Sequence, residues 1–329
     1  MDSMDRKITQ CLVYDGRATF RRIADVLGIS EQTVARRYRA LSDSGALRIQ
    51  VRANEHALGL RRWFVRIQCR PNAAAPLGDA LAARDDVGWV NTTSGGSEVV
   101  CVAFSSRDGV AGSVLDRLPR TSQVLGFTAF AVLHTHIGDA TKWTAFDEPL
   151  TREQFAALTV DKFAPPAKTV RPTSSLVPED DRLLRELADD GRATIATLAR
   201  VTGRSQAAVS ARLEELLLGG TVYVAVDIAP AAFGFDTTAY LWLTVAPGEL
   251  HSVGRQLSLL PETSYTAAVS GPANLVVTVV CPDLADLYTL VTEKIGALPA
   301  IRQVEAVPVL RRFKQGDTRL QDQRLLPRA

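Results

Sequence analysis

The chain has 329 residues, more than one hydrophobic core usually serves, so two or more domains are expected. A composition of 46% hydrophobic and 22% charged residues is that of an ordinary globular protein, and a net charge of +2 is too small to mark the whole chain as a nucleic-acid binder. The four cysteines stand far apart, and neither a signal peptide nor an apolar run of membrane-spanning length is present, so we expect a reduced, cytoplasmic protein without a disulfide framework, zinc site or membrane contact.

Three short helices are predicted at the N-terminus. The first spans residues 5–14, and we expect Gly16 to close it as a C-terminal glycine. Thr19 caps the second helix, and a turn at Gly28 leads into a third helix that Ser30 caps. Because the last two helices are joined by a short glycine turn, the three form a helix-turn-helix domain.

The third helix has one apolar face and an opposite face made of long hydrogen-bond donors: Gln32, Arg36 and Arg39. Glutamine can read adenine, and arginine guanine, with two hydrogen bonds each, so this face suits the major groove of DNA. A solvated basic helix without a partner is the alternative. The predicted DNA-binding residues are Ser30, Gln32, Thr33, Arg36, Arg37 and Arg39.

After a connecting strand at 47–51, the pattern changes to strand, helix, strand, strand, helix, strand, which is the ferredoxin-like arrangement. The expected strands span 63–69, 87–93, 99–104 and 124–136, with helices around Leu77 and over 110–118.

The sequence then repeats itself. Gly16-Arg-Ala-Thr19 recurs as Gly191-Arg-Ala-Thr194, and the same offset of 175 residues relates Ser30 to Ser205 and Leu41 to Leu216. A shared register this long indicates duplication of a whole unit. We therefore predict an α+β fold with two copies of a helix-turn-helix head followed by a ferredoxin-like βαββαβ sandwich. The second sandwich is expected to have strands at 240–245, 266–270, 275–280 and 304–310, and helices near Leu257 and over 284–295.

Six segments are predicted in all. They are the first helix-turn-helix domain (1–52), the first ferredoxin-like domain (58–139), a linker (140–177), the second helix-turn-helix domain (178–227), the second ferredoxin-like domain (233–314) and a tail (315–329). The linker contains Pro149, Pro165, Pro166 and Pro172 and is expected to be exposed, with a short helix capped by Thr151 in its middle. The tail is polar and expected to be frayed.

These motifs and their order resemble the Lrp/AsnC (leucine-responsive, feast/famine) transcriptional regulators. The head reads Asp-x-x-x-Ile/Leu-x-x-Leu, Asp-Gly-Arg-Ala-Thr, Gly-x-Ser and Val-x-x-Arg-x-x-x-Leu, and the likeness covers nearly the whole chain, twice over. It implies dimers formed through the sandwich sheets, further assembly into rings, and amino acids or related molecules bound between sandwiches. We expect an internal pseudo-dimer that binds double-stranded DNA, a small-molecule effector and further copies of itself, without a cofactor or enzymatic activity.

In the family the effector loop reads Gly-x-x-Asp between the second and third sandwich strands. The matching segments here read Gly95-Gly96-Ser97-Glu98 and Gly271-Pro272-Ala273-Asn274. Neither has the aspartate, which counts against a simple amino acid, although Glu98 can accept from an ammonium group. The candidate effector residues are Gly95, Gly96, Glu98, Gly271 and Asn274; plain hairpin turns that use glycine for positive φ are the alternative.

The two heads are expected to differ. At the 175-residue offset, the three donors of the first head become Ala207, Ala211 and Glu214. Residues 1–52 have a net charge of +4, whereas residues 176–227 have −3, and an acidic surface is repelled by phosphate. We expect the first head to read sequence, so that two symmetry-related chains are needed on a pseudo-palindromic site. Arg204 and Arg212 are candidates for residual phosphate contact.

Two other classes remain open. Siroheme decarboxylases share this architecture and use histidine and arginine around a tetrapyrrole, but this chain has four histidines and no Trp-Pro-Tyr-Asn signature. An interaction scaffold with degenerate heads is the other. His134 and His136 point to one face of a strand, as two metal ligands would, yet no third ligand is near in sequence, so no metal site is predicted.

Overall fold

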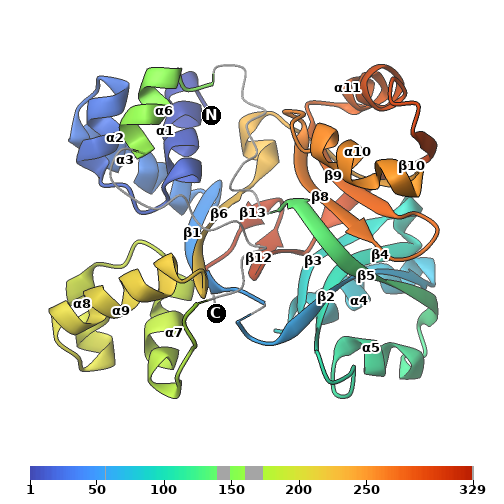
Figure 1. The fold of residues 1–329 in the computed structure, drawn as a ribbon, viewed down its shortest axis with the longest axis horizontal. Coiled ribbons are helices and arrows are strands. Elements are labelled where there is room, and N and C mark those ends of the chain that lie inside the picture. Colours follow the sequence, from blue (N-terminus) through green and yellow to red (C-terminus); the bar gives the residue numbers. More distant parts are fainter. Residues whose placement is uncertain (56, 139–148, 160–172, 328–329) are drawn as a thin grey trace. The chain divides into compact units, whose positions relative to one another are not determined.

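The computed structural model describes residues 1–55, 57–138, 149–159 and 173–327. The chain forms two compact units, and the division does not follow the two sequence copies. One unit contains both heads (Met1–Gly59 and Ala140–Ile228), and the other contains both sandwiches (Leu60–Asp139 and Ala229–Pro327) (Figure 1). Among the described residues, no helix has the length and apolar character needed to cross a membrane.

Both heads are built from three short helices, and the first head has a fourth. The helices are α1 (Ser3–Tyr14), α2 (Phe20–Leu27), α3 (Glu31–Asp43) and α6 (Arg152–Thr159) in the first head, and α7 (Asp181–Asp189), α8 (Ile195–Thr202) and α9 (Gln206–Leu218) in the second. The predicted caps are confirmed, because the side chains of Thr19 and Ser30 accept hydrogen bonds from the backbone N–H groups of Arg22 and Thr33. Gly28 ends α2 in the left-handed conformation.

Helix α6 comes from the middle of the segment expected to be an exposed linker. Its predicted cap is confirmed, since Thr151 Oγ1 accepts from the N–H of Gln154 at 3.2 Å. The helix packs on the first head: Leu158 is buried, and the Phe155 ring meets the Tyr14 ring edge-on at 4.7 Å. Most residues of α6 are nevertheless exposed, and Pro165, Pro166 and Pro172 lie outside the described residues.

A two-stranded antiparallel ribbon joins the heads. It consists of β1 (Leu47–Ala53) and β6 (Val222–Ile228), and its register places Gln50 opposite Ala225. These two positions are equivalents at the 175-residue offset, so the ribbon is arranged about a pseudo-twofold axis. The arginines next to the repeated glycines obey the same symmetry. Arg17 donates to the carbonyl oxygens of Gly191 and Ala193, and Arg192 donates to those of Gly16 and Ala18.

The expected role of Gly16 as a helix-closing glycine is wrong. Helix α1 ends at Tyr14 with an extended Asp15 as its C-cap, and Gly16 is not among the residues with positive φ. A larger residue does not fit at position 16 for another reason, because a Cβ there would lie 2.6 Å from Cγ1 of Val224 in the ribbon. Glycine at this position therefore permits close approach of the first head to the ribbon.

The sandwich unit is a closed barrel of eight strands. They are β2 (Leu60–Cys69), β3 (Val87–Thr93), β4 (Glu98–Ser106) and β5 (Val124–Ile137) from the first copy, and β7 (Thr237–Val245), β8 (Thr263–Val269), β9 (Leu275–Cys281) and β10 (Ile301–Arg312) from the second. Their order is β10-β3-β4-β2-β5-β8-β9-β7, so the last strand of each copy pairs with the second strand of the other. Closure in this way leaves neither sandwich with an unpaired edge.

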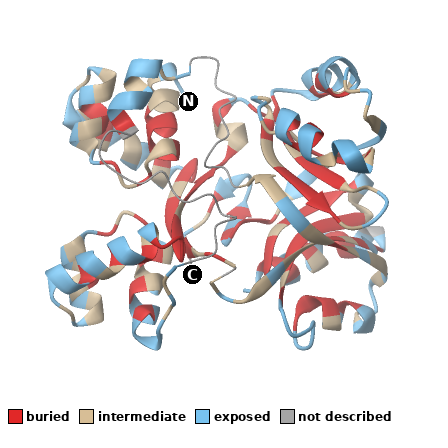
Figure 2. Cartoon of the chain, viewed as in Figure 1, coloured by how far each residue is buried: buried red, intermediate tan, exposed pale blue. Residues whose placement is uncertain are grey.

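The helices of the sandwich unit pack on the outside of the barrel. The main ones are α4 (Ala74–Ala82) and α5 (Val114–Arg117) in the first copy, and α10 (Leu250–Leu257) and α11 (Leu284–Thr289) in the second. The predicted helix over 110–118 is shorter than expected, and the one over 284–295 changes from α-helix to π-helix at Leu290. Most residues of β3, β4, β7 and β9 are buried, while the helices turn exposed residues outward (Figure 2). The barrel interior combines valine and alanine side chains with four buried aromatic ones, Phe64, Phe130, Tyr240 and Trp242.

The expectation of a frayed tail is wrong. Residues beyond β10 form a small sheet of β11 (Lys314–Gln315), β12 (Thr318–Gln321) and β13 (Arg324–Leu325). Phe313 is 2% exposed and belongs to the core of the first sandwich, where Gly78 leaves room for its ring. Lys314 Nζ donates to the carbonyl oxygens of Arg84 and Val87 at 2.6 and 2.8 Å. The end of the second copy thus completes the first.

Candidate functional site

The exposed face of α3 is the candidate nucleic-acid interface. Its inner face is fixed by Val34 and Leu41, which are 0% and 1% exposed. Gln32, Arg36 and Arg39 lie exposed on the opposite side, as the periodicity predicts. The helix is preceded by the short turn from α2, which is the geometry of a helix-turn-helix reading head.

Three other predicted DNA-binding residues have contacts within the head. Ser30 and Thr33 cap the start of α3, and their hydroxyl oxygens lie 2.8 Å apart. Arg37 forms ion pairs of 2.7 Å with both Asp2 and Asp5, which cap α1. The structure therefore gives Arg37 a role in holding α3 against the start of α1.

The second head repeats this internal ion pair but not the outer face. Arg212, the equivalent of Arg37, lies 2.7 Å from Asp180 and 2.8 Å from Glu215. Burial by itself raises the pKa of Asp180, but hydrogen bonds from Arg212 and from a backbone N–H outweigh it and hold the pKa below its ordinary value. Ala207, Ala211 and Glu214 occupy the exposed face of α9.

The first candidate effector loop holds its carboxylate by internal hydrogen bonds. Gly95 and Gly96 have φ values of 69° and 85° between β3 and β4. Glu98, 5% exposed, accepts from Arg66 Nε at 2.7 Å and from the hydroxyls of Thr93 and Ser94 at 2.8 and 3.1 Å. The same Arg66 guanidinium binds Glu305 on β10 and thereby links the two copies.

The second loop is also tied to the backbone. The side-chain amide of Asn274 accepts from Val245 N and donates to Val245 O, both at 2.9 Å. Gly271 has a φ of 102°, and a Cβ there would lie 2.9 Å from the Phe130 ring. Asn274 therefore replaces backbone hydrogen bonds at the end of β7, and Gly271 lets the loop approach the first copy.

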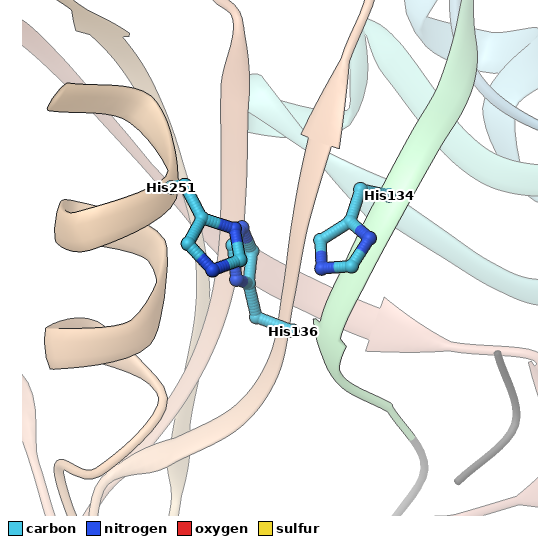
Figure 3. Close-up of side chains that lie close together, drawn as sticks. All are labelled: His134, His136 and His251. Carbon is cyan, nitrogen blue, oxygen red and sulfur yellow. The ribbon is translucent and has the colours of Figure 1, made fainter. Parts of the chain in front are cut away.

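A cluster of three histidines lies in the sandwich unit, and the strand pattern of the sequence relates only two of them. His134 and His136 on β5 meet His251 on α10, and their candidate ligand nitrogens all lie within 4.8 Å of one another. The rings point toward one another (Figure 3), with centroids 4.6 to 5.6 Å apart. Burial lowers the pKa of His136 to about 4, aided by the two neighbouring imidazoles, so this ring is neutral near pH 7. No sequence pattern relates positions 136 and 251; only the pairing of β5 with β8 brings them together.

Family models match both halves of the chain. The AsnC-type helix-turn-helix domain matches residues 1–42 and again 180–217, and the Lrp/AsnC ligand binding domain matches residues 238–318. The chain belongs to the Lrp/AsnC family of transcriptional regulators.

Individual relatives of this Lrp/AsnC chain match one copy at a time. An uncharacterised HTH-type transcriptional regulator of Pyrococcus abyssi (strain GE5 / Orsay) is 28% identical over 127 residues, which is 38% of this chain and 80% of the relative. The HTH-type transcriptional regulator FL11 of the same organism is 28% identical over 138 residues, which is 41% of this chain and 91% of FL11. Each such regulator is therefore equivalent to about half of the duplicated chain.

Solved structures also match this Lrp/AsnC chain, and we describe one that covers almost its full length. It is the siroheme decarboxylase NirDL, with a TM-score of 0.62, 12% identity, and coverage of 95% of this chain and 93% of NirDL. At that identity the likeness shows only that NirDL and this chain share a fold.

Proposed function

We propose that this Lrp/AsnC regulator binds double-stranded DNA through α3 of its first head. The observation that carries the proposal is the difference between two equivalent exposed faces. Gln32, Arg36 and Arg39 present long donors, where α9 presents Ala207, Ala211 and Glu214. Arginine and glutamine side chains at the surface of a reading helix can form paired hydrogen bonds with base edges, whereas alanine cannot.

The charges of the two heads support the same assignment. The window 1–52 has a net charge of +4 and the window 176–227 has −3. Cations that displace counterions from phosphate supply much of the affinity for DNA, so the first head is favoured and the second is repelled. We therefore assign the second head a structural role, and we propose that two chains related by symmetry place two first heads on a pseudo-palindromic site.

The test compares matched variants of the two heads. DNA bound by the full chain is selected from a random pool, and affinities are then measured by fluorescence anisotropy at several salt concentrations. The Arg36→Ala, Arg39→Ala variant should bind the selected site at least tenfold more weakly, because each good base contact contributes about 1–3 kcal/mol. The Ala207→Glu, Ala211→Glu variant, which adds negative charge to the second head, should bind as the unchanged protein does. Equal losses in the two variants would contradict the proposed asymmetry.

We further propose that effector binding, if it uses the two loops, does not use Glu98 as the ligand of an ammonium group. The Glu98 carboxylate already accepts from Arg66, Thr93 and Ser94, so an amino acid would have to displace a charged hydrogen bond. Thermal unfolding of the full chain in the presence of each amino acid should show no shift that Glu98→Gln removes. A stabilisation lost in Glu98→Gln but kept in Asn274→Ala would contradict this proposal and indicate that Glu98 binds the ammonium group of an amino acid.

A second candidate function is a siroheme decarboxylase, favoured by the common fold with NirDL over 95% of the chain. Its cheapest test is the absorption spectrum of siroheme mixed with the protein. A regulator without tetrapyrrole chemistry leaves the Soret band in place and releases no carbon dioxide. A decarboxylase shifts the band and releases carbon dioxide from the carboxylate substituents of siroheme.

Gel shifts at several salt concentrations separate a DNA-binding regulator from a pure interaction scaffold. A regulator of DNA is proposed to act in the cytoplasm.

A further inference from the structure

The three histidines of the sandwich unit form a constellation with the chemistry of a metal site. Their candidate ligand nitrogens lie within 4.8 Å of one another, and a zinc ion held at about 2.0–2.1 Å by tetrahedral ligands has those nitrogens about 3.3 Å apart. His134 and His251 are exposed, so their rings can rotate about the side-chain torsions to reduce that difference. Imidazole is a preferred ligand of zinc and of its first-row neighbours.

One ring of the cluster has a buried, unpaired nitrogen. Nε2 of His136 is inaccessible to solvent and has no hydrogen-bond partner among the described residues. A buried polar atom of this kind costs stability unless something binds it. His136 belongs to the cluster of three, in which each ring offers one nitrogen within 4.8 Å of the others. The cluster therefore includes a ring whose hydrogen-bonding capacity the described residues do not use fully.

The backbone around the site makes room for the cluster. The pairing of β5 with β8 is irregular on both sides, between Val132 and His134 and between Thr135 and Ile137, and such irregularities redirect side chains. On the helix side, a Cβ on Gly254 would overlap the His136 ring, so glycine at this position lets α10 bring His251 close (Figure 3). The strand and the helix come from different copies of the duplication.

We propose that His134, His136 and His251 bind one divalent transition-metal ion of the zinc class, which links β5 of the first copy to α10 of the second. Three protein nitrogens leave a fourth coordination position for water or an anionic ligand. The site occurs once per chain, because the equivalent positions at the 175-residue offset are Val309, Arg311 and Pro76. This proposal is independent of how the heads bind DNA.

The experiment uses the full-length chain without a histidine tag, stripped of metal with a chelator and dialysed. Zinc chloride is titrated calorimetrically, and cobalt chloride is titrated with detection of the visible bands of Co²⁺. We expect saturation at one ion per chain, a cobalt spectrum of low coordination number, and a rise in the unfolding temperature on adding zinc. Binding weaker than that of free imidazole, or several equivalent weak ions per chain, would overturn the proposal.

Variants separate this site from adventitious binding by surface histidines. His251→Gln and His136→Ala should each abolish the saturable ion, and His56→Ala, which changes the only other histidine of the sequence, should leave it unchanged. Gly254→Ala removes no ligand but displaces His136, so it should weaken binding without altering the histidine content. Circular dichroism of the metal-free variants checks folding; if His136→Ala does not fold, the exposed His251→Gln decides. Retention of the ion in His251→Gln would refute the assignment.

Discussion

A single arginine on each reading helix holds that helix to the first helix of its head. Arg212 binds Asp180, a carboxylate that is 0% exposed, whereas Arg37 binds Asp2 and Asp5, of which Asp2 is 55% exposed. The pairs Arg37–Asp5 and Arg212–Asp180 are related by the duplication, and Asp180 is more deeply buried than Asp5, which is 15% exposed. Removing one partner of a buried ion pair leaves an uncompensated charge, which costs far more than losing an exposed pair.

We predict that Arg212→Ala lowers the free energy of unfolding by about 3–5 kcal/mol. Arg37→Ala is the matched control and should lower it by less, because water can solvate the carboxylate of Asp2 after the change. Urea unfolding of both full-length variants, followed by circular dichroism, measures the difference. Equal destabilisation would show that burial of the carboxylate does not decide the strength of the pair.

Two carboxylates make the stability depend on acid. Burial opposes the depressed pKa of Asp180, but the hydrogen bond from Arg212 prevails, and hydrogen bonds from Arg66 lower the pKa of Glu305. A carboxyl whose pKa is lower in the folded than in the unfolded state stabilises the fold above its unfolded pKa of about 4 and loses that contribution as the pH falls further.

The unfolding midpoint is therefore expected to be steady from pH 7 to about pH 5 and to fall steeply below about pH 4. Asp180→Asn should be less stable than the unchanged chain at pH 7 and should show a shallower decline in acid, since one of the titrating groups is gone. Thermal unfolding at half-unit pH steps measures both slopes. Parallel declines would mean that Asp180 does not contribute to the acid dependence.

At the scale of whole elements, the ribbon of β1 and β6 determines how the heads pack. Gly191 donates its N–H to Ile49 O at 2.8 Å, and a Cβ on Gly191 would lie 2.7 Å from three backbone atoms of Gln50. Backbone atoms in a paired strand cannot move aside as the end of a flexible side chain can. Glycine at 191 is therefore a packing requirement of the ribbon.

Gly191→Ala is predicted to destabilise the head unit by about 1–3 kcal/mol, the range observed for overpacked sites. Gly248→Ala is the control, because a Cβ there meets nothing within 4 Å and its φ is not positive. It should leave the unfolding midpoint unchanged. Differential scanning calorimetry of the full chain gives both values, and a neutral Gly191→Ala would show that the ribbon yields more easily than its pairing suggests.

Local sequence patterns predicted the helices and strands well, but they did not predict which distant strands pair with one another. The caps at Thr19, Ser30 and Thr151 depend on residues within three positions, and all three are confirmed. The alternation at 47–51 indicates a strand but carries no information about β6 as its partner. For the same reason the true role of Gly16 was missed, because its constraint comes from Val224, more than 200 residues away.

The candidate site divides along the same line. The exposed face of α3 follows from helical periodicity alone, and the structure places Gln32, Arg36 and Arg39 where that periodicity puts them. The contacts that tie down Arg37 and Glu98 depend on tertiary neighbours, as does the arrival of His251 beside His136. Sequence spacing cannot show such neighbours, since folding within a copy brings the first two sets together and pairing between the copies brings the third.

For the molecule as a whole, the pairing of strands between the two copies determines whether a single copy can fold without a partner. The first copy alone would leave β1 without β6, β3 without β10 and β5 without β8. Unpaired strands of this kind associate with others of the same shape. The full chain satisfies all three by folding onto itself.

We predict that residues 1–139 expressed alone form a homodimer. In it, another molecule of the fragment replaces the second copy of the full chain. Size-exclusion chromatography with light scattering should give twice the mass of the fragment, and dilution should dissociate it. Mixing it with a separately expressed fragment of residues 173–329 should restore the original pairing. A stable monomer of residues 1–139 would contradict the edge argument.

Joining the two halves in one polypeptide also changes what mutation can do. In a homodimer every substitution appears in both subunits. A substitution that weakens DNA binding by one helix therefore weakens it in both subunits at once. Here the halves are encoded separately, and assembly between them does not weaken on dilution. One half can therefore differ from the other, as Ala207, Ala211 and Glu214 differ from Gln32, Arg36 and Arg39.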